Sequence, residues 1–364
     1  DDTRVSIGVG SEVLSVTNSK VGIGITNPNE KLDVNGSVKI TDKYLFENNL
    51  SNKPGFKYEG GYVKFSNDGI YWFNLSIFYG KGYFGGGTTG ISSNEIDGID
   101  FQTESAINPS ATLVVARAYL AGVNSSVKGY FGGGNVASYQ NEIDGIDFQT
   151  ESAINPSATL AVARHDLAGV NSSIKGYFGG GWAGGSRSNE IDGINFQTES
   201  AINPSATLAV ARNSLSGVNS SIKGYFGGGY TGSNSNEIDG IDFQTESAIN
   251  PSATLVVARS RLAGVNSSIK GYFGGGHTGS NSNEIDGINF QTESAINPSA
   301  TLAVARNSLS GVNSSIKGYF GGGYAVPDSN EIDGIDFQTE SAINPSATLA
   351  VARIGLAGVQ AGAL

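Results

Sequence analysis

The stretch Gly129-Tyr130-Phe131-Gly132-Gly133-Gly134 opens a unit of about 47 residues that the chain repeats six times. Its tyrosine recurs in steps of 47, 47, 48, 47 and 47 residues, at Tyr83, Tyr130, Tyr177, Tyr225, Tyr272 and Tyr319. A repeat of this length is typical of solenoids and β-propellers, because one such unit cannot bury its apolar face without neighbours. Residues that all six copies share are therefore expected to maintain the fold, and residues that vary are free for recognition.

The composition agrees with many short strands and turns. The chain of 364 residues contains 53 Gly, about twice the usual frequency, and its hydrophobic share is 38%. No stretch reaches the roughly 18 apolar residues of a transmembrane helix, so we expect no membrane insertion. Cysteine is absent, which excludes disulfides and thiolate metal sites, and the net charge of −11 argues against nucleic-acid partners.

Each copy divides into four apolar segments separated by turn residues, as the second copy illustrates. We expect strand b at 129–132, strand c at 142–150, strand d at 158–164 after a turn at 154–157, and strand a at 167–171. Four strands per unit is typical of a propeller blade. The small residues of strand a suit the crowded position nearest the axis.

The order of these motifs resembles that of kelch repeats. In kelch repeats a strand ending in glycines is followed by a hydrophobic-Asp-hydrophobic-x-Thr stretch and an Arg-terminated strand, which Ile146-Asp147-Phe148-Gln149-Thr150 and Arg164 match. This chain lacks the tryptophan after the threonine, and its unit is slightly shorter than the roughly 50 residues usual for kelch. The resemblance implies an all-β, kelch-like β-propeller.

Counting strands predicts six blades over residues 81–364. The first copy begins at strand b, and the last copy ends with an additional strand a at 356–360, which fits the inner position that blade one lacks. Closing the ring in this way leaves few exposed strand edges. The alternative is that Phe73–Tyr79 fills blade one and that a seventh blade has been lost.

The segment before the repeats carries a different motif. Gly22-Ile23-Gly24-Ile25-Thr26-Asn27-Pro28, followed by Lys31-Leu32-Asp33-Val34-Asn35-Gly36, resembles a motif of tail fibres and other fibrous virion proteins of bacteriophages, with Ile25 in place of the usual threonine. The stretch Phe65–Trp72 resembles a β-hairpin of such fibres. Because three chains intertwine in those proteins, the resemblance implies a homotrimeric β-rich stem at 1–53, which contacts other virion proteins, and a β connector at 54–80.

Nearly all variation between the copies falls in two kinds of loop. In a four-stranded antiparallel blade the b–c and d–a loops emerge on one face, and these are the variable ones, whereas the repeated Asn-Ser-Ser and Ile-Asn-Pro-Ser turns belong to the opposite face. Aromatic rings beside small polar residues are typical of glycan and protein recognition sites. Loop drift without selection is the alternative. The candidate ligand-binding residues are Tyr119, Tyr139, His165, Asp166, Trp182, Arg187, Tyr230, Arg261, His277 and Tyr324.

The repeated charged residues are expected to be structural. The strand-end arginines, Arg117, Arg164, Arg212, Arg259, Arg306 and Arg353, are expected to pair with a carboxylate such as Asp100 or Asp147 or with loop carbonyls. A positive ring around the axial opening is the alternative. The Asp-Gly-Ile-Asp stretch lacks EF-hand ligand spacing, so no metal and no cofactor are expected.

No catalytic residues are predicted, because an enzyme needs a locally asymmetric group of acids, bases or nucleophiles. The single-copy candidates are spread over several blades, and they are His165, Asp166, Arg187, Arg261, His277 and Asp328. The sequence therefore predicts an adhesive fibre or tip protein on the virion surface that attaches to a host cell-surface glycan or protein. One alternative is a decoration or cement protein of capsid or tail whose propeller packs against another virion protein, and another is a glycan-degrading enzyme.

Overall fold

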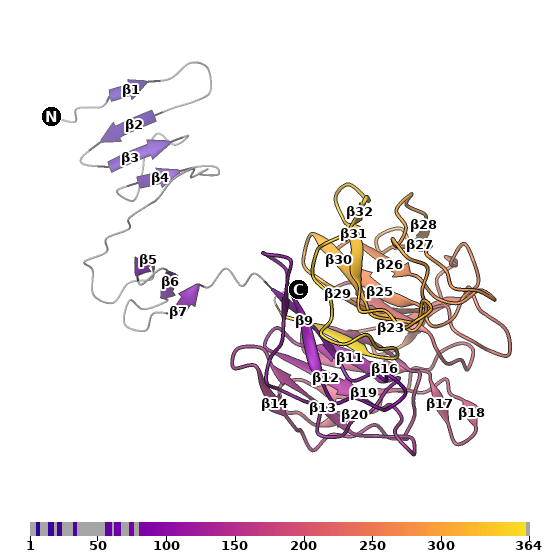
Figure 1. Cartoon of the computed structure of the whole chain (residues 1–364). Helices are drawn as coiled ribbons and strands as arrows, with labels where there is room; N and C mark the ends of the chain where they lie inside the picture. Colours follow the sequence, from indigo (N-terminus) through magenta and orange to yellow (C-terminus); the bar gives the residue numbers. More distant parts are fainter. Residues whose placement is uncertain are drawn as a thin grey trace. The chain divides into compact units, whose positions relative to one another are not determined.

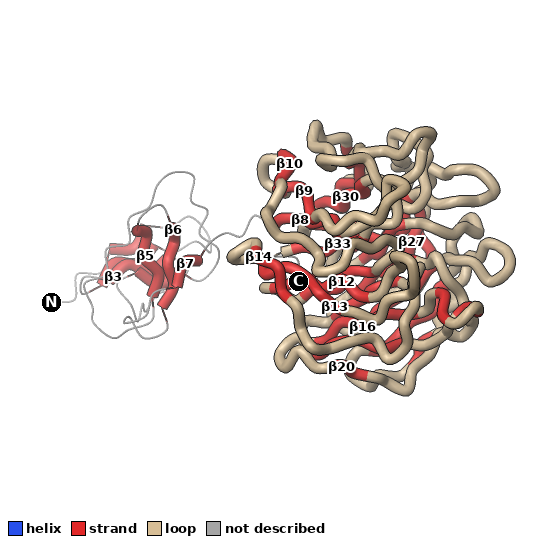
Figure 2. Tube along the Cα trace, turned by 60° about the horizontal axis from the view of Figure 1, so that its bottom comes forward, coloured by secondary structure: helices blue, strands red, loops and turns tan. Residues whose placement is uncertain are grey.

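The computed structural model describes residues 80–361 and, before them, only the strands β1 to β7. The chain forms two compact units, Asp1–Ile77 and Phe78–Leu364. Every regular element that the structure describes is a β-strand (Figure 2), so the protein is all-β as predicted. The described residues contain no helix long and apolar enough to cross a membrane.

The strands of the first unit form two small sheets. The four-stranded sheet consists of β1 (Val5–Ile7), β2 (Leu14–Thr17), β3 (Lys20–Ile23) and β4 (Leu32–Val34), of which β3 and β4 pair in parallel. The three-stranded antiparallel sheet consists of β5 (Gly55–Glu59), β6 (Tyr62–Ser66) and β7 (Phe73–Leu75). The turns of the fibre motif and residues 67–72 of the hairpin motif lie outside the described residues, and the predicted trimer stays a prediction.

The second unit is a six-bladed β-propeller of four-stranded antiparallel blades (Figure 1). From the axis outward, blade one is β33 (Ala357–Gln360), β8 (Lys81–Gly85), β9 (Ile96–Asp100) and β10 (Ser105–Ile107). Blade two is β11 (Ala121–Asn124), β12 (Lys128–Gly132), β13 (Ile143–Asp147) and β14 (Ser152–Ile154). Blade three is β15 (Ala168–Asn171), β16 (Lys175–Gly179), β19 (Ile191–Asn195) and β20 (Ala201–Ile202), with an added hairpin of β17 (Trp182–Ala183) and β18 (Ser186–Arg187).

The remaining three blades repeat this arrangement. Blade four is β21 (Ser216–Asn219), β22 (Lys223–Gly227), β23 (Ile238–Asp242) and β24 (Ala248–Ile249). Blade five is β25 (Ala263–Asn266), β26 (Lys270–Gly274), β27 (Ile285–Asn289) and β28 (Ser294–Ile296). Blade six is β29 (Ser310–Asn313), β30 (Lys317–Gly321), β31 (Ile332–Asp336) and β32 (Ala342–Ile343).

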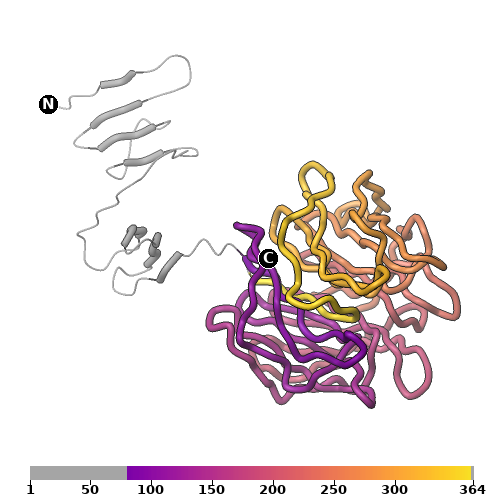
Figure 3. Tube along the Cα trace, in the orientation of Figure 1, coloured from indigo at the N-terminus to yellow at the C-terminus, as the bar shows by residue number. Residues whose placement is uncertain are grey.

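The ring is closed by the C-terminal strand. β33 pairs antiparallel with β8, with Val359 opposite Tyr83, so the two ends of the propeller segment share blade one. Figure 3 shows the yellow end of the chain returning to the indigo beginning of the propeller. The alternative, in which Phe73–Tyr79 fills blade one, is wrong because β33 occupies that position and β7 pairs with β6 instead.

The inner strands approach one another so closely that glycine is required there. A Cβ atom on Gly169 would lie 2.1 Å from the carbonyl oxygen of Gly122 in the neighbouring blade, far inside the van der Waals limit. The same contact recurs around the axis at every inner strand, up to Gly358 against Gly311. The prediction of small residues at the axis is therefore confirmed, with the glycine of each strand a as its strictest case.

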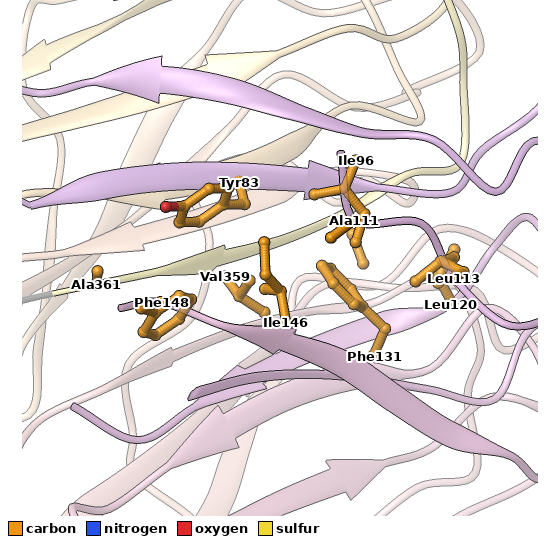
Figure 4. Close-up of a cluster of buried hydrophobic side chains, with 11 residues drawn as sticks. Tyr83, Ile96, Ala111, Leu113, Leu120, Phe131, Ile146, Phe148, Val359 and Ala361 are labelled. Carbon is orange, nitrogen blue, oxygen red and sulfur yellow. The ribbon is translucent and has the colours of Figure 1, made fainter. Parts of the chain in front are cut away.

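Apolar side chains of neighbouring blades pack together and form the core. Between blades one and two, Tyr83 and Ile96 face Phe131, Ile146 and Phe148, all at most 7% exposed (Figure 4). The rings of Tyr83 and Phe148 stack with centroids 5.5 Å apart. Similar clusters lie between the other blades. Each blade therefore buries its apolar faces against its neighbours, as the repeat length predicts.

The outer strand of each blade differs from the prediction. In blade two it is Ser152–Ile154 rather than 158–164, and the strand before it ends at Asp147. The carboxylate of Asp147 accepts hydrogen bonds from the backbone N–H groups of Gln149 and Thr150, which turns the chain directly after the strand. Pro156 then interrupts regular pairing. The predicted strand 158–164 keeps one isolated bridge, and the predicted turn at 154–157 belongs to the outer edge of the blade.

The strand-end arginines are buried ion-pair partners, not a positive ring at the axial opening. Arg164 is 0% exposed and contacts Asp192 at 2.5 Å, and its guanidinium also donates to the carbonyl oxygen of Phe178 at 2.9 Å. The Asp192 carboxylate accepts a further hydrogen bond from the Ala161 backbone N–H. The six pairs are Arg117–Asp144, Arg164–Asp192, Arg212–Asp239, Arg259–Asp286, Arg306–Asp333 and Arg353–Asp97.

Pairing with a carboxylate is therefore confirmed, but the predicted partners, Asp100 and Asp147, are wrong. The partner is the aspartate that opens each Asp-Gly-Ile-Asp or Asp-Gly-Ile-Asn stretch, because residues three apart on a strand point to opposite sides. Asp144 is buried beside Arg117, and Asp147 caps the following turn. Each arginine lies on the segment between two blades, and its side chain contacts the second of them. In five of the six, the backbone N–H of the arginine donates to the first blade, as that of Arg117 does to the carbonyl of Ser93.

A second repeated contact joins neighbouring blades. The ammonium group of Lys128 and the hydroxyl of Tyr130 donate to the same carboxylate oxygen of Glu199 in the next blade, at 2.7 and 3.0 Å. The Lys128 hydrogen bond lowers the pKa of Glu199, whereas burial and the Glu199 contact raise the pKa of Tyr130. Glutamates equivalent to Glu199 contact the lysine of the preceding blade throughout the ring.

Candidate functional site

The variable residues gather at one end of the propeller, which we call the variable face. It comprises the residue after each triple glycine, the dipeptide before each inner strand, and the loop residues beside them. In each blade the residue after the triple glycine forms an isolated β-bridge with the first residue of the dipeptide. The bridges are Thr88 with Ile354, Asn135 with Ala118, Trp182 with His165, Tyr230 with Asn213, His277 with Ser260, and Tyr324 with Asn307. The expectation that the two kinds of variable loop share one face is confirmed.

A closed ring of six backbone hydrogen bonds lies at the centre of this face. The ring members are the second residues of the six dipeptides, Tyr119, Asp166, Ser214, Arg261, Ser308 and Gly355, each with a φ between 55° and 64°. The N–H of each member donates to the carbonyl of the member before it, over 2.6 to 2.9 Å. Five of the six ring members are not glycine, and the hydrogen bonds of the ring hold their backbone in this disfavoured conformation. The ring thus holds variable side chains at fixed positions around the axis.

An axial cavity of about 130 Å³ is lined by the ring and the inner strands. At its other end, asparagines of neighbouring blades interact, as where the side-chain oxygen of Asn171 accepts from the N–H of Asn124 at 3.2 Å. Apart from the ring, the lining of the cavity is nearly the same in every blade, which argues against a selective site there.

Tyr119, Tyr139, His165 and Asp166 form a first group of candidate residues. The rings of Tyr139 and His165 lie 4.8 Å apart, and those of Tyr119 and His165 lie 6.3 Å apart. The Nδ1 atom of His165 is 2.9 Å from the Asp166 carboxylate, in a geometry that forms no hydrogen bond. Burial and the nearby Asp166 raise the pKa of the Tyr119 hydroxyl. Tyr119 packs against Gly355, the ring member without a side chain.

Trp182, Arg187 and Tyr230 form a second group. The β17–β18 hairpin places Arg187 opposite Trp182, and the guanidinium carbon of Arg187 lies 5.5 Å from the Trp182 ring centroid. The same atom lies 4.9 Å from the Tyr230 ring of the next blade. The arginine therefore contacts both aromatic rings, in a geometry typical of cation–π interactions. This contact spans blades three and four and holds both aromatic rings in place.

A surface pocket of about 220 Å³ lies beside the second group, between blades four and five. All of its lining residues occupy variable positions, and they are Asn213, Ser214, Tyr230, Asn234, Ser260, Arg261 and His277. The Ser260 hydroxyl donates to the Asn234 side-chain oxygen at 2.9 Å, which fixes part of the rim. The lining thus combines an aromatic ring, amides, hydroxyls and a guanidinium.

The corresponding place between blades five and six is closed. The Asn281 side chain donates to the carbonyl oxygens of Tyr324 and Ala325 and accepts from Asn307. Tyr324, the last candidate, is 41% exposed and lies apart from the two groups. The hydrogen bonds of Asn281 therefore distinguish this place from the pocket between blades four and five.

Most of the predicted candidates are brought together. Tyr119, Tyr139, His165 and Asp166 form the first group, and Trp182, Arg187 and Tyr230 form the second. Arg261 and His277 line the pocket beside Tyr230, which belongs to both the pocket and the second group. The sequence-based candidates omitted the small polar residues of the pocket, Asn213, Ser214, Asn234 and Ser260. Their variation between copies was the signal that could have identified them.

The candidate side chains of the variable face are aromatic rings, amides, hydroxyls, imidazoles and charged groups. Among the described residues, no three His, Cys, Asp or Glu side chains are grouped in a way that could hold a metal ion. Side chains of these kinds can stack, form hydrogen bonds and pair charges with a ligand. The sequence matches no protein-family model and no curated protein. What the structure establishes is a six-bladed β-propeller whose internal variation is concentrated on one face.

Proposed function

We propose that this protein is a fibre or tip protein of a bacteriophage-type virion and attaches to a host cell-surface glycan through the variable face. One observation carries the proposal. The repeated charged and aromatic residues are used in contacts between blades, whereas the residues that surround a pocket on one face all lie at positions that vary between the copies. A rigid scaffold that presents varied loops is a common architecture of binding proteins.

The composition of the pocket favours a glycan over a protein ligand. Stable protein interfaces bury about 800 Å² per partner and have apolar centres. Here the pocket is small, and amides, hydroxyls and one tyrosine ring form much of its lining. Sugars present hydroxyl groups for such amides and apolar ring faces for stacking on aromatic side chains. A host glycan is therefore the ligand that the chemistry of the variable face fits best.

The fibre-like motif supports multivalent attachment. Three chains on one stem would present three weak glycan sites, and binding at one site would raise the effective concentration of ligand at the others. Light scattering of the full chain measures the number of subunits. Three chains per particle is the expected result, and a monomer at high concentration would remove the trimeric stem from the proposal.

A structural role in the virion is the second candidate, and the face opposite the variable face favours it. This constant face carries the repeated turns between inner and second strands, whose exposed apolar residues are Val127, Ile174, Ile222, Ile269 and Ile316. These residues are 58 to 62% exposed, although they occupy the same position in five of the six blades. A symmetric apolar surface of this kind suits contact with another virion protein.

Binding of the labelled full chain to a glycan array tests the proposal. The variants Trp182→Ala and Tyr230→Ala should each lower glycan binding at least about tenfold, since truncating an aromatic anchor typically removes 2 kcal/mol or more. The matched control, Ile174→Ser, changes a similarly exposed residue on the constant face and should leave binding unchanged. Undiminished binding of both aromatic variants, or loss only in the control, would reject glycan attachment through the variable face.

A further inference from the structure

Nearly all positively charged side chains of the propeller form repeated ion pairs, and two of them do not. Between Gly80 and Ala361, every lysine and arginine except two belongs to one of the two repeated ion-pair sets. The exceptions are Arg187 and Arg261, and neither forms an ion pair with any described residue. Both are single-copy residues of the variable face, in a chain whose net charge is −11. Isolated cations in an acidic protein point to a local function for their charge.

The two exceptional arginines lie near the same aromatic residue, Tyr230. Arg187 lies 4.9 Å from the centroid of Tyr230, and Arg261 lines the pocket together with Tyr230 and His277. No aspartate or glutamate is among the described residues that line this pocket. The carboxylate of Asp166 lies instead beside His165, in the first group. Asp166 and Arg261 both act on the Tyr119 hydroxyl and both line the axial cavity, but only Arg261 also lines the pocket.

We infer that the pocket binds an acidic sugar residue that carries a carboxylate. Tyr230 provides a ring for stacking against the sugar, and Asn213, Asn234 and Ser260 provide groups for its hydroxyls. Arg261 is exposed at the rim and offers the planar pair of N–H donors that matches a carboxylate. Arg187 covers one face of Tyr230 and adds positive potential to the pocket. The inference rests on the proposed glycan attachment and specifies the charge and position of the ligand.

An acidic peptide is the competing ligand, and the pocket favours the sugar. The pocket is lined by seven residues of two neighbouring blades, an extent that suits one sugar ring better than an extended chain. An acidic peptide would also meet the net negative charge of the protein along its whole length. A single sugar carboxylate places one negative charge beside Arg261 and leaves the rest of the ligand neutral.

Titration calorimetry with paired oligosaccharides tests the inference on the full chain. The acidic probes are 3′-sialyllactose and trigalacturonate, their neutral counterparts are lactose and galactotriose, and poly-glutamate represents an acidic peptide. At least one acidic probe should bind about tenfold more tightly than its neutral counterpart. Arg261→Gln should remove this preference with little change for the neutral sugar, because a charge-assisted pair contributes about ten- to a hundredfold in affinity. Arg187→Gln should also reduce the preference for the acidic sugar over the neutral one.

The control variant is Lys81→Gln, which changes the net charge equally but lies in a repeated ion pair remote from the variable face. The affinity of this variant for the acidic probe should stay within about twofold of the wild-type affinity. Equal binding of acidic and neutral sugars with no effect of Arg261→Gln would overturn the acidic preference and leave glycan attachment intact. Arg261-dependent binding of poly-glutamate alone would overturn it in favour of an acidic protein. If no acidic probe binds but Tyr230-dependent binding to the glycan array persists, only this inference fails. If neither the acidic probes nor the glycan array shows Tyr230-dependent binding, the proposed function is rejected as well.

Discussion

At the scale of single residues, the glycine of each inner strand sets how closely the blades can approach. Gly169 has no room for a Cβ atom, because the nearest obstacle is the backbone carbonyl of Gly122, which cannot rotate away. A flexible side chain in that place could adjust, whereas a backbone atom moves only if the whole strand moves. The close approach of the six inner strands around the propeller axis therefore depends on six such glycines.

Gly169→Ala should destabilise the protein by about 3 kcal/mol or more, since overpacking against a rigid neighbour exceeds the usual range of 1–3 kcal/mol. Urea unfolding followed by tyrosine and tryptophan fluorescence measures the change. The control is Gly184→Ala in the β17–β18 hairpin, where the added Cβ meets no atom within 4 Å and only the φ of 55° is unfavourable. It should cost about 1 kcal/mol. Equal effects of the two variants would contradict the close-approach explanation.

Residue identity also determined how far the site could be predicted. Aromatic and charged residues such as Trp182 and Arg187 were recognisable as candidates because they differ from the residues at the same positions of the other copies. Asn213 and Ser260 differ as well, but small polar residues are common in loops, and only the pocket geometry separates them from ordinary turn residues. The ring that includes Ser214 depends on hydrogen bonds between successive blades, which no local pattern reveals.

At the scale of elements, the contact from strand β12 to the turn after β19 joins two blades through one carboxylate. Lys128 and Tyr130 of β12 both donate to Glu199, whose side chain is about one third exposed. The pKa of Glu199 is lowered from its ordinary value of 4.5, chiefly by the hydrogen bond from Lys128. A carboxylate with a lowered pKa in the folded state stabilises the protein above its unfolded pKa. That stabilisation is lost as the pH falls through the folded pKa.

Wild-type protein should therefore be more stable than Glu199→Gln at neutral pH, by about 0.5–1 kcal/mol for a partly exposed pair. The difference should begin to shrink below about pH 4.5 and vanish once the folded pKa has been passed. Chemical denaturation of both proteins between about pH 7 and pH 3 measures it. Glu190→Gln removes an exposed carboxylate that is in no ion pair with a described residue, and it should show a much smaller pH-dependent difference. A Glu199→Gln difference that stays constant with pH would argue against the ion pair.

The strands themselves were predicted unequally. The inner three strands of each blade carry apolar or glycine-rich patterns and were found within a few residues of their observed limits. The outer strand was misplaced because Ala158–Arg164 is the more apolar segment, while Ser152–Ile154 has only three residues. Hydrogen bonds from the turn at Asp147 and the buried pairing of Arg164 decide between the two. These interactions depend on neighbouring elements, which a local hydrophobic pattern does not include.

At the scale of the whole molecule, the repeat separates stability from recognition. Pairs such as Arg164–Asp192 and Lys128–Glu199 hold neighbouring blades together and recur around the ring, so loops on the variable face can change without altering them. The period and the additional last strand predicted the number of blades and their closure, because both follow from counting units. The position of the pocket between blades four and five could not be predicted, because it depends on which loop side chains fill the space.

The central claim is that attachment to the host uses the variable face of the propeller and leaves the constant face free. Hydroxyl-radical footprinting of the full chain, free and bound to cells that it recognises, tests this claim most directly. Tyr230 and Ile174 are suitable reporters, because they lie on opposite faces and are 38% and 61% exposed. Protection of Tyr230 and Trp182 with unchanged oxidation of Ile174 is the predicted result. Protection of Ile174 and its equivalents, with Tyr230 still fully reactive, would contradict it.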